Sequence, residues 1–280
     1  MKVSIVGYGF VGKAIKNALS NSVDLQKVDP KLNTSISDLR DFKPNIIFIC
    51  VPTPMEQDGS QNISILMEIV NEIKSLKLNS LVVIKSTIIP SHISTIEKAL
   101  PDFVYNPEFL REKYADEDFI NSSLIIFGGS KNPTKKLANF YDNFLNCKNK
   151  EYTFTDAISA SFVKYTINTF LATKVIFFNE LFQLFSASGA SEEWLEFTKI
   201  VSKDKRIGQS HMNVPGHDGR YGFGGACLPK DSNAILKYAE SLDKNLSILK
   251  RVIKTNNKIR ASYNVNTERE NEQNIFFEDK

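Results

Sequence analysis

The sequence has little that could hold a metal ion or build a disulfide framework. Its 280 residues include only three histidines and three cysteines, and Cys50, Cys147 and Cys227 lie far apart. Disulfide-rich domains carry a dense, even set of cysteines, so this odd count favours a reducing compartment. His211 and His217 have no third ligand at a suitable spacing, so we expect no metal site.

An excess of either charge is also lacking. Lys and Arg number 35, and Asp and Glu number 32, which gives a net charge of +3. This value is too small to indicate nucleic acid or an anionic membrane as the main partner. The 42% of hydrophobic residues excludes a wholly disordered chain, which would lack the apolar surface to offset its conformational entropy.

No uninterrupted apolar run reaches the roughly 20 residues that a membrane-spanning helix needs. The first residues, MKVSIVGYGFVGKAI, are interrupted by glycines and are not followed by a small-residue cleavage site, so they do not resemble a secretory signal. We therefore expect a cytoplasmic protein with no membrane partner.

Strands alternate with helices in the first half of the chain. Apolar runs predict strands at 2–6, 23–28, 46–51, 81–84, 103–105 and 123–127, with helices at 13–19, 64–77, 91–100 and 133–147. The run 46–51, IIFICV, is typical of a strand buried on both faces of a parallel sheet. The predicted fold class is α/β, with an N-terminal Rossmann doubly wound sheet over residues 1–155.

The second half is predicted to be helical. Residues 156–188 form an apolar-rich stretch without Pro or Gly, which predicts one long helix or two in series. Further helices are expected from 191 and from 231 to about 260, with a glycine-rich loop at 206–225. We expect an α-helical central or dimerisation domain over 156–262 and a polar tail over 263–280.

A dinucleotide-binding pattern follows the first predicted strand. Gly7-x-Gly9-x-x-Gly12 opens a helix, and the acidic Asp29 ends the next strand. Such glycines permit a tight turn, an approach of the backbone to a pyrophosphate, and close packing of helix on strand. Asp29 would bind the adenosine ribose and repel a 2′-phosphate, so we expect NAD as the cofactor. The alternative is a glycine turn without a ligand.

A cysteine lies just before a second predicted helix start. In the run GFGGACLPKD at 222–231, Cys227 follows two glycines and precedes Lys230 and Asp231. The unpaired N–H groups of a helix start favour the thiolate, and the glycines let a substrate approach the backbone. An isolated cysteine is usually a small buried hydrophobe, but this setting favours a nucleophile.

These motifs together resemble the UDP-glucose/GDP-mannose dehydrogenase family. VPTP at 51–54, KST at 85–87, NPEFLRE at 106–112, Lys164-x-x-x-Asn168 and RIG at 206–208 occur in the family's order, and the resemblance covers roughly residues 1–260. It implies a four-electron oxidation of a sugar-nucleotide alcohol to a carboxylate with two NAD, for polysaccharide biosynthesis. The resemblance implies that Cys227 forms a thiohemiacetal and then a thioester.

The resemblance also assigns roles to the matching residues. Lys164 and Asn168 would donate to a developing oxyanion, and Glu108 would be the base for thioester hydrolysis. Asp231 would assist a catalytic water or orient Lys164, and Thr87 would hold a water near the reacting carbon or touch the nicotinamide. Arg206 would reach the substrate of a neighbouring subunit, which implies a homodimer. The expected catalytic residues are Cys227, Lys164, Asn168, Asp231, Glu108 and Thr87. The expected cofactor-binding residues are Gly7, Tyr8, Gly9, Phe10, Val11, Gly12, Asp29, Val51, Pro52, Thr53, Ser86, Thr87, Glu112 and Lys230. The expected substrate-binding residues are Glu108, Phe109, Leu110, Arg111, Lys164, Asn168, Arg206, Tyr221, Gly222, Phe223, Gly224 and Cys227.

The sequence departs from the family in length. Members usually carry a C-terminal Rossmann-like domain, and nothing after Arg260 predicts one; the segment between Asp29 and Cys50 is also short. The chain is expected to be a minimal enzyme, a truncated product, or one that needs a polypeptide partner. UDP-glucose is the favoured substrate and GDP-mannose or another sugar nucleotide the alternative. A hydroxyacid dehydrogenase related to the 6-phosphogluconate enzymes, or a non-catalytic NAD-binding remnant, are the other hypotheses.

Overall fold

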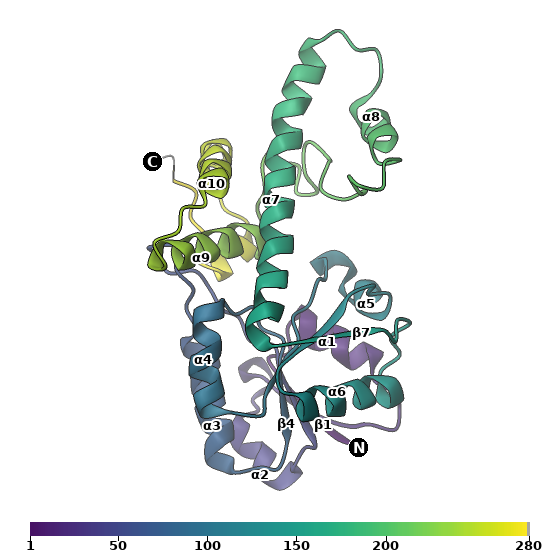
Figure 1. Cartoon of the computed structure of the whole chain (residues 1–280), viewed down its shortest axis with the longest axis vertical. Coiled ribbons are helices and arrows are strands. Elements are labelled where there is room, and N and C mark those ends of the chain that lie inside the picture. The colour runs from purple at the N-terminus through teal and green to yellow at the C-terminus, as the bar shows by residue number, and fades with distance from the viewer. Residues whose placement is uncertain (279–280) are drawn as a thin grey trace. The chain divides into compact units, whose positions relative to one another are not determined.

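The computed structural model describes residues 1–278, which divide into two compact units (Figure 1). Unit 1 comprises Met1–Thr53 and Asn62–Lys164. Unit 2 comprises Pro54–Gln61 and the chain after Lys164. The predicted domain limit at 155 falls just before the long helix, whereas unit 1 extends to Lys164 within it.

Unit 1 is a seven-stranded sheet in the order β2-β1-β3-β4-β5-β6-β7. Every adjacent pair is parallel except β5 and β6, which pair antiparallel, so the expected parallel sheet is in fact mixed. The strands are β1 (Lys2–Val6), β2 (Asp24–Val28), β3 (Ile46–Ile49), β4 (Leu81–Ile84), β5 (Val104–Tyr105), β6 (Ile125–Gly128) and β7 (Tyr152–Thr155). The helices are α1 (Phe10–Ala18), α2 (Leu39–Phe42), α3 (Ser64–Leu76), α4 (Pro90–Ala99), α5 (Ala115–Ile120) and α6 (Lys131–Phe144), with 3-10 turns at Pro30–Leu32, Ile36–Asp38 and Glu112–Tyr114.

Helices cover both faces of this sheet and produce two hydrophobic cores. Ile47 and Ile49 of β3 face Leu66 and Val70 of α3 in one core. The alternate residue Phe48 faces the other core, where α1, α5 and α6 pack. Because successive side chains of a strand point to opposite faces, a strand buried on both faces must be apolar throughout. The predicted doubly wound α/β fold is confirmed.

The strand order reverses direction between β1 and β3, which are adjacent although β2 lies between them in sequence. Ligands of open α/β sheets bind in the crevice outside the carboxyl ends of the strands at such a switch point. The glycine turn after β1 and the VPTP segment after β3 both lie at this edge, since each follows the carboxyl end of its strand.

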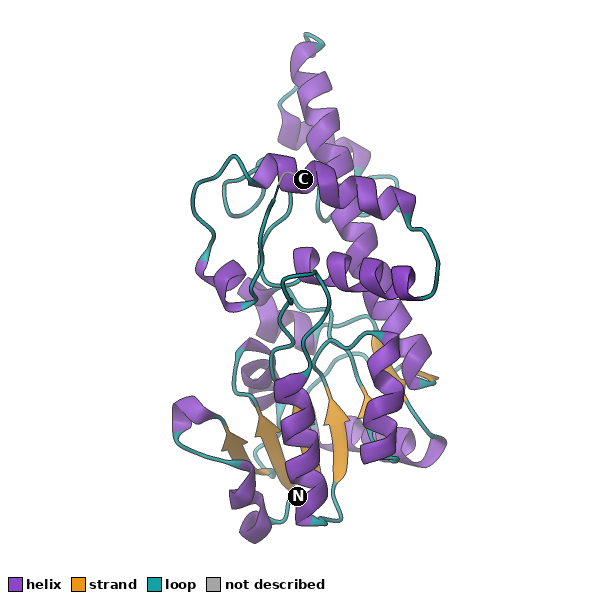
Figure 2. Cartoon of the chain, turned by 90° about the vertical axis from the view of Figure 1, so that its left-hand side faces the viewer, coloured by secondary structure: helices purple, strands orange, loops and turns teal. Residues whose placement is uncertain are grey.

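Unit 2 consists of helices and loops, and all the named strands of residues 1–278 lie in unit 1 (Figure 2). Its helices are the greater part of α7 (Ala157–Ala187), α8 (Trp194–Val201), α9 (Leu228–Ser241), α10 (Ser247–Arg260) and α11 (Glu268–Glu272). The expected polar tail is therefore folded through α11, which a capping box between Thr267 and Glu270 closes at its start. The loop 54–61 joins this unit because the Met55 N–H donates to the Gln273 carbonyl at 3.0 Å.

Helix α7 is one continuous helix. This confirms the prediction of one long helix over that of two in series. By length and composition alone α7 could cross a membrane, and 22% of its most apolar window is buried within the protein. Lys164, Asn168, Lys174 and Asn179 are nevertheless buried along it and hydrogen-bonded within the protein. Polar side chains held in this way are typical of a helix in a globular core.

Several helix boundaries differ from the predicted ones. Helix α4 begins at Pro90 with Ile89 as its N-cap, so Ser91 is not the cap; proline is favoured at the first helical position because its missing N–H would be unpaired there. Helix α6 begins at Lys131, before Pro133. The sequence analysis did not predict α2, α5, β7 or α11, which are short elements with few apolar repeats.

Candidate active site

The glycine turn of unit 1 has the geometry that a dinucleotide requires. Gly7 has φ +86°, and a Cβ there would lie 2.8 Å from the Cys50 carbonyl carbon. A Cβ on Gly12 would lie 2.5 Å from the Gly7 oxygen, so helix α1 packs directly on the turn. Gly9 is different, since a Cβ there would meet no atom within 4 Å. Gly7 and Gly12 are therefore required by the fold, whereas the space at Gly9 is open to a ligand, and these residues fit NAD.

Asp29 is held beside this turn. Its Oδ2 accepts the Tyr8 N–H at 2.7 Å, and its Oδ1 accepts the Lys31 N–H at 2.9 Å. The carboxylate therefore faces the glycine turn from the end of β2 and keeps lone pairs for a ribose hydroxyl. The Lys27 ammonium lies over the Tyr8 ring, 4.7 Å from the ring centre. Phe10 and Val11 follow in the first turn of α1 and are half-buried.

The VPTP and KST segments are joined by two hydrogen bonds. The Ser86 hydroxyl donates to the Val51 carbonyl at 2.7 Å, and the Thr53 hydroxyl donates to the Thr87 carbonyl at 2.9 Å. Val51, Thr53 and Ser86 are buried, Thr87 is half-buried and Pro52 is exposed. These two bonds connect the predicted cofactor-side residues that follow β3 and β4.

Glu108 and Lys164 form a buried ion pair in unit 1. The Lys164 ammonium lies 3.2 Å from Glu108 Oε1 and donates to the Glu108 carbonyl oxygen at 2.5 Å. Glu108 Oε2 accepts the Leu110 N–H at 2.6 Å, and the Phe109 ring lies 5.3 Å from the ammonium. Glu108 and Lys164, to which the sequence assigned separate roles, are therefore hydrogen-bonded to each other.

Arg111 and Glu112 lie at the exposed end of the same segment. Arg111 makes a bidentate pair with Asp118, which raises the pKa of the guanidinium through those hydrogen bonds. Glu112 begins a 3-10 turn and is exposed. Neither shares the buried position of Glu108.

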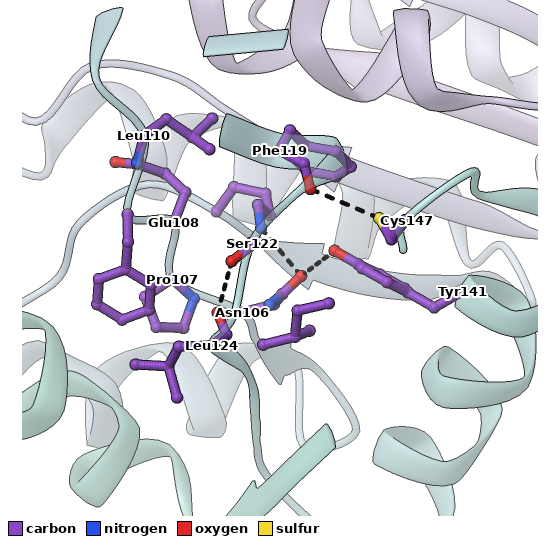
Figure 3. A pocket seen from close by; sticks show the side chains of 12 residues that line it. Asn106, Pro107, Glu108, Leu110, Phe119, Ser122, Leu124, Tyr141 and Cys147 are labelled. Carbon is purple, nitrogen blue, oxygen red and sulfur yellow. Dashed lines mark hydrogen bonds between the residues drawn. The ribbon is translucent and has the colours of Figure 1, made fainter. Parts of the chain in front are cut away.

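A small cavity beside Glu108 contains a network that the sequence analysis missed (Figure 3). Asn106 Oδ1 accepts from Lys85 Nζ at 3.0 Å and from the Tyr141 hydroxyl at 2.6 Å. Burial lowers the pKa of Lys85 to about 8 and raises that of Cys50 to about 12, in both cases chiefly by desolvation. The cavity measures about 20 Å³, room for one water molecule. Lys85 and Asn106 begin the KST and NPEFLRE motifs, but neither was predicted as a site residue.

Unit 2 contains the predicted nucleophile and a second polar cluster. Cys227 is the half-buried N-cap residue of α9, and its carbonyl accepts the Asp231 N–H at 2.9 Å. The Asp231 carboxylate accepts from Asn168 Nδ2 at 2.6 Å and from Lys230 Nζ at 2.5 Å. Asp231, Asn168 and Lys230 are buried. The structure thus brings together four of the predicted residues on the first turn of α9 and on α7.

The glycine-rich loop before Cys227 is fixed from behind by two asparagines. The Gly222 N–H donates to Asn179 at 2.9 Å. Asn256 accepts the Phe223 N–H at 2.7 Å and donates to the Phe223 carbonyl at 2.9 Å. Tyr221 is exposed and its N–H donates to the Tyr263 hydroxyl. These buried asparagines were not predicted because they lie far from the loop in sequence.

Arg206 is an exposed residue of the loop before Cys227. Its side chain is 88% exposed, and its partner is the neighbouring Asp204. Among residues 1–278, no group of three or more His, Cys, Asp and Glu side chains could hold a metal ion.

Two domain models of one family match the chain. Residues 25–145 match the NAD binding domain of the UDP-glucose/GDP-mannose dehydrogenase family, and residues 158–258 match its central domain. The chain belongs to this family. The match also identifies unit 1 as an NAD-binding domain, in agreement with its glycine turn and Asp29.

Similar curated proteins carry the name UDP-glucose 6-dehydrogenase. The Rickettsia felis protein is 34% identical over 218 residues, which are 75% of this chain and 47% of that protein. The Bacillus subtilis protein YwqF is 29% identical over 309 residues, or 93% of this chain and 67% of that protein. The chain thus spans between about half and two thirds of the length of these relatives.

Solved structures are similar as well. A UDP-glucose dehydrogenase from Pyrobaculum islandicum superposes with a TM-score of 0.76 and 26% identity, covering 92% of this chain and 68% of that one. A 3-hydroxyisobutyrate dehydrogenase from Mycobacterium tuberculosis superposes with a TM-score of 0.71 at 14% identity, covering 99% of this chain and 96% of that one. The second likeness concerns the fold alone.

Proposed function

We propose that this protein is an NAD-dependent nucleotide-sugar dehydrogenase that oxidises UDP-glucose to UDP-glucuronate. The observation that carries the proposal is the half-buried Cys227 at the start of α9, with Asp231, Asn168 and Lys230 hydrogen-bonded one turn away. A simple alcohol dehydrogenase has no need of such a thiol, because its aldehyde or ketone product leaves without a covalent intermediate.

The first oxidation converts the C6 alcohol to an aldehyde. NAD, when bound, supplies a hydride acceptor in each of the two oxidations. The alcohol proton passes to a protein base or water, and Lys164 and Asn168 donate to the developing oxyanion. A buried ammonium and a buried amide act strongly on such a charge because few water molecules screen them.

The second oxidation passes through Cys227. Its thiolate attacks the aldehyde carbon to form a carbon–sulfur bond, and the oxyanion takes up a proton. Loss of a hydride and a proton from this thiohemiacetal gives a thioester. The open helix start at Cys227 stabilises the thiolate, and the glycines before it leave space for the sugar.

Hydrolysis completes the reaction. Water attacks the thioester carbonyl, Glu108 accepts its proton, and the thiolate of Cys227 leaves. One alcohol, two NAD⁺ and one water thus give one carboxylate, two NADH and three protons. The buried ion pair with Lys164 supports this role, since it holds the Glu108 carboxylate in one position.

The names of the relatives favour UDP-glucose over GDP-mannose as the substrate. The test is incubation of the purified protein with NAD and each sugar nucleotide in turn, comparing the wild type with Cys227→Ser. We expect carboxylate from UDP-glucose with the wild type. The variant should lose the second oxidation and release at most aldehyde. A Cys227→Ser protein that still forms carboxylate at the wild-type rate would overturn the thioester route.

A hydroxyacid dehydrogenase is the second candidate function. The 3-hydroxyisobutyrate enzyme shares the fold over almost the whole of both chains. It predicts one NADH per substrate and no dependence on Cys227. A non-catalytic NAD-binding remnant is the third, and it predicts NAD binding without turnover on any of these substrates.

We also propose a cytoplasmic homodimer formed through α7. Phe170, Phe177 and Leu184 recur every seven residues on this helix and are 62%, 57% and 67% exposed. Such spacing makes an apolar seam suited to a second helix. Arg206 would reach the partner's substrate. Light scattering should give twice the chain mass, and Phe177→Glu should give a monomer.

A further inference from the structure

The segment after α10 folds back onto the glycine loop that carries Cys227. Glu270 of α11 accepts the Gly225 N–H at 3.1 Å, two residues before the cysteine. The same carboxylate accepts the Thr267 N–H at 2.7 Å and pairs with Arg260 at 2.6 Å. Glu270 is fully buried, although a glutamate is rarely buried without a partner.

Arg260 links this carboxylate to the earlier part of the loop. It is 2% exposed, and its second nitrogen pairs with Asp218 at 2.7 Å. The guanidinium lies over the Tyr263 and Phe277 rings, 5.8 and 5.3 Å from their centres. One planar side chain therefore joins the loop at 218 to α11, a geometry that lysine could not reproduce.

The backbone of the loop is fitted to this pair. A Cβ on Gly224 would overlap the Arg260 guanidinium and Glu270 Oε1, so the loop passes directly against both charges. Gly225 has φ +76°, which aims its N–H at the carboxylate. Neither contact is needed to close the core of unit 2, where Phe223 packs on Ala172, Ile176 and Val252.

We propose that Arg260 and Glu270 are positioning residues for the Cys227 nucleophile, and that residues 267–275 act as a clamp on its loop. The inference rests on the proposed function, since it gives the clamp its purpose. Fixing Gly224 and Gly225 fixes the direction in which the chain enters α9. The Cys227 thiol is then held at the start of α9. Without the clamp, motion of Gly224 and Gly225 would displace it.

Glu270→Ala tests the clamp, with Glu272→Ala as the matched control. Glu272 lies on the same helix but is exposed and pairs with Arg269 at the surface. Hydrogen exchange of the peptide 222–227 should speed up about tenfold in Glu270→Ala and stay unchanged in the control. The rate of Cys227 alkylation by iodoacetamide at pH 7, followed by peptide mass spectrometry, should fall about threefold or more, because the thiolate loses the helix start.

Catalysis should respond through kcat. We expect kcat to fall about tenfold in Glu270→Ala with KM for NAD unchanged, since the glycine turn and Asp29 lie in unit 1. Glu270→Gln, which keeps an acceptor for Gly225, should recover part of both rates and serves if the alanine variant does not fold. Faster exchange with unchanged alkylation would reduce Glu270 to a structural residue and overturn the proposal. Exchange and alkylation need neither NAD nor sugar, so they decide the clamp even if UDP-glucose is not oxidised.

Discussion

Asn168 donates its side-chain amide to the Asp231 carboxylate at 2.6 Å, and Lys230 donates to the other oxygen of the same carboxylate. The three side chains are buried, so each depends on the others for its hydrogen bonds. This arrangement fixes the orientation of the Asn168 side-chain amide.

Asp231→Asn should damage both stability and turnover. The variant leaves the Lys230 ammonium buried without its counter-charge, which should cost about 3 kcal/mol of unfolding free energy. It also weakens the acceptor that orients Asn168, so kcat should fall about a hundredfold. Urea unfolding and steady-state kinetics measure the two effects. Asp243→Asn is the control, because Asp243 is exposed and its φ of +55° suits asparagine. Equal stability of the two variants would contradict the account.

Gly9→Ala and Gly12→Ala should separate cofactor binding from folding. A Cβ at Gly9 meets nothing in the protein, so Gly9→Ala should fold normally and yet weaken NAD binding about tenfold or more. Gly12→Ala should lower the melting temperature, because its Cβ would overlap the Gly7 carbonyl. Calorimetric titration with NAD and thermal unfolding give the two readouts. Normal NAD affinity in a well-folded Gly9→Ala protein would show that the phosphates lie elsewhere.

Lys85→Met should stabilise the protein at neutral pH. Lys85 has a folded pKa of about 8, below its ordinary value of 10.5, so folding disfavours its charge. Below pH 8 the penalty is complete. Between pH 8 and 10.5 the unfolded chain binds the proton more strongly, and stability rises with pH. The variant should therefore gain about 2 kcal/mol at pH 7, after loss of the bond to Asn106, and its advantage should vanish near pH 10.5. A variant that is less stable at pH 7 would contradict this.

Glu270 should make unit 2 labile to acid. Burial opposes its ionisation, but the Thr267 and Gly225 N–H groups and the Arg260 charge outweigh that effect and lower its pKa. A lowered folded pKa gives stability that is present above the unfolded value of about 4.3 and lost as pH falls through the folded value. Fluorescence of Trp194, the one tryptophan of the chain, reports on unit 2 during acid unfolding. Glu270→Gln should be less stable than wild type at pH 7, and the difference should shrink below pH 4. A constant difference across that range would contradict the prediction.

The sequence predicted the elements whose signal is local. The apolar runs predicted β1, β3 and β4 almost to the residue, because a strand buried on both faces is mostly apolar; Ser4 of β1 is a buried polar exception. The antiparallel pairing of β6 with β5 was missed, since strand direction depends on connections and not on apolar patterning. The folded tail was missed because α11 consists mostly of charged residues, which are typical of an exposed segment. Only the structure shows that Glu270 is buried against Arg260.

The residues of the candidate site also fall into those that a local sequence motif marks and those that only the structure reveals. Sequence motifs marked Cys227, Asp231 and the glycine turn as candidates, because the chemistry expected of them depends on their neighbours in sequence. Asn256 and Arg260 were not predicted, because Asn256 meets Phe223 across 33 positions and Arg260 meets Asp218 across 42. No local pattern marks a residue whose only function is to hold another segment.

The count of NADH formed per sugar consumed tests the central claim most directly. Purified protein with excess NAD and a limiting amount of UDP-glucose should form about two NADH per sugar and yield the carboxylate, because a thioester at Cys227 carries the oxidation past the aldehyde. A value of one NADH per sugar, with aldehyde as the final product, would contradict the four-electron oxidation and the role given to Cys227.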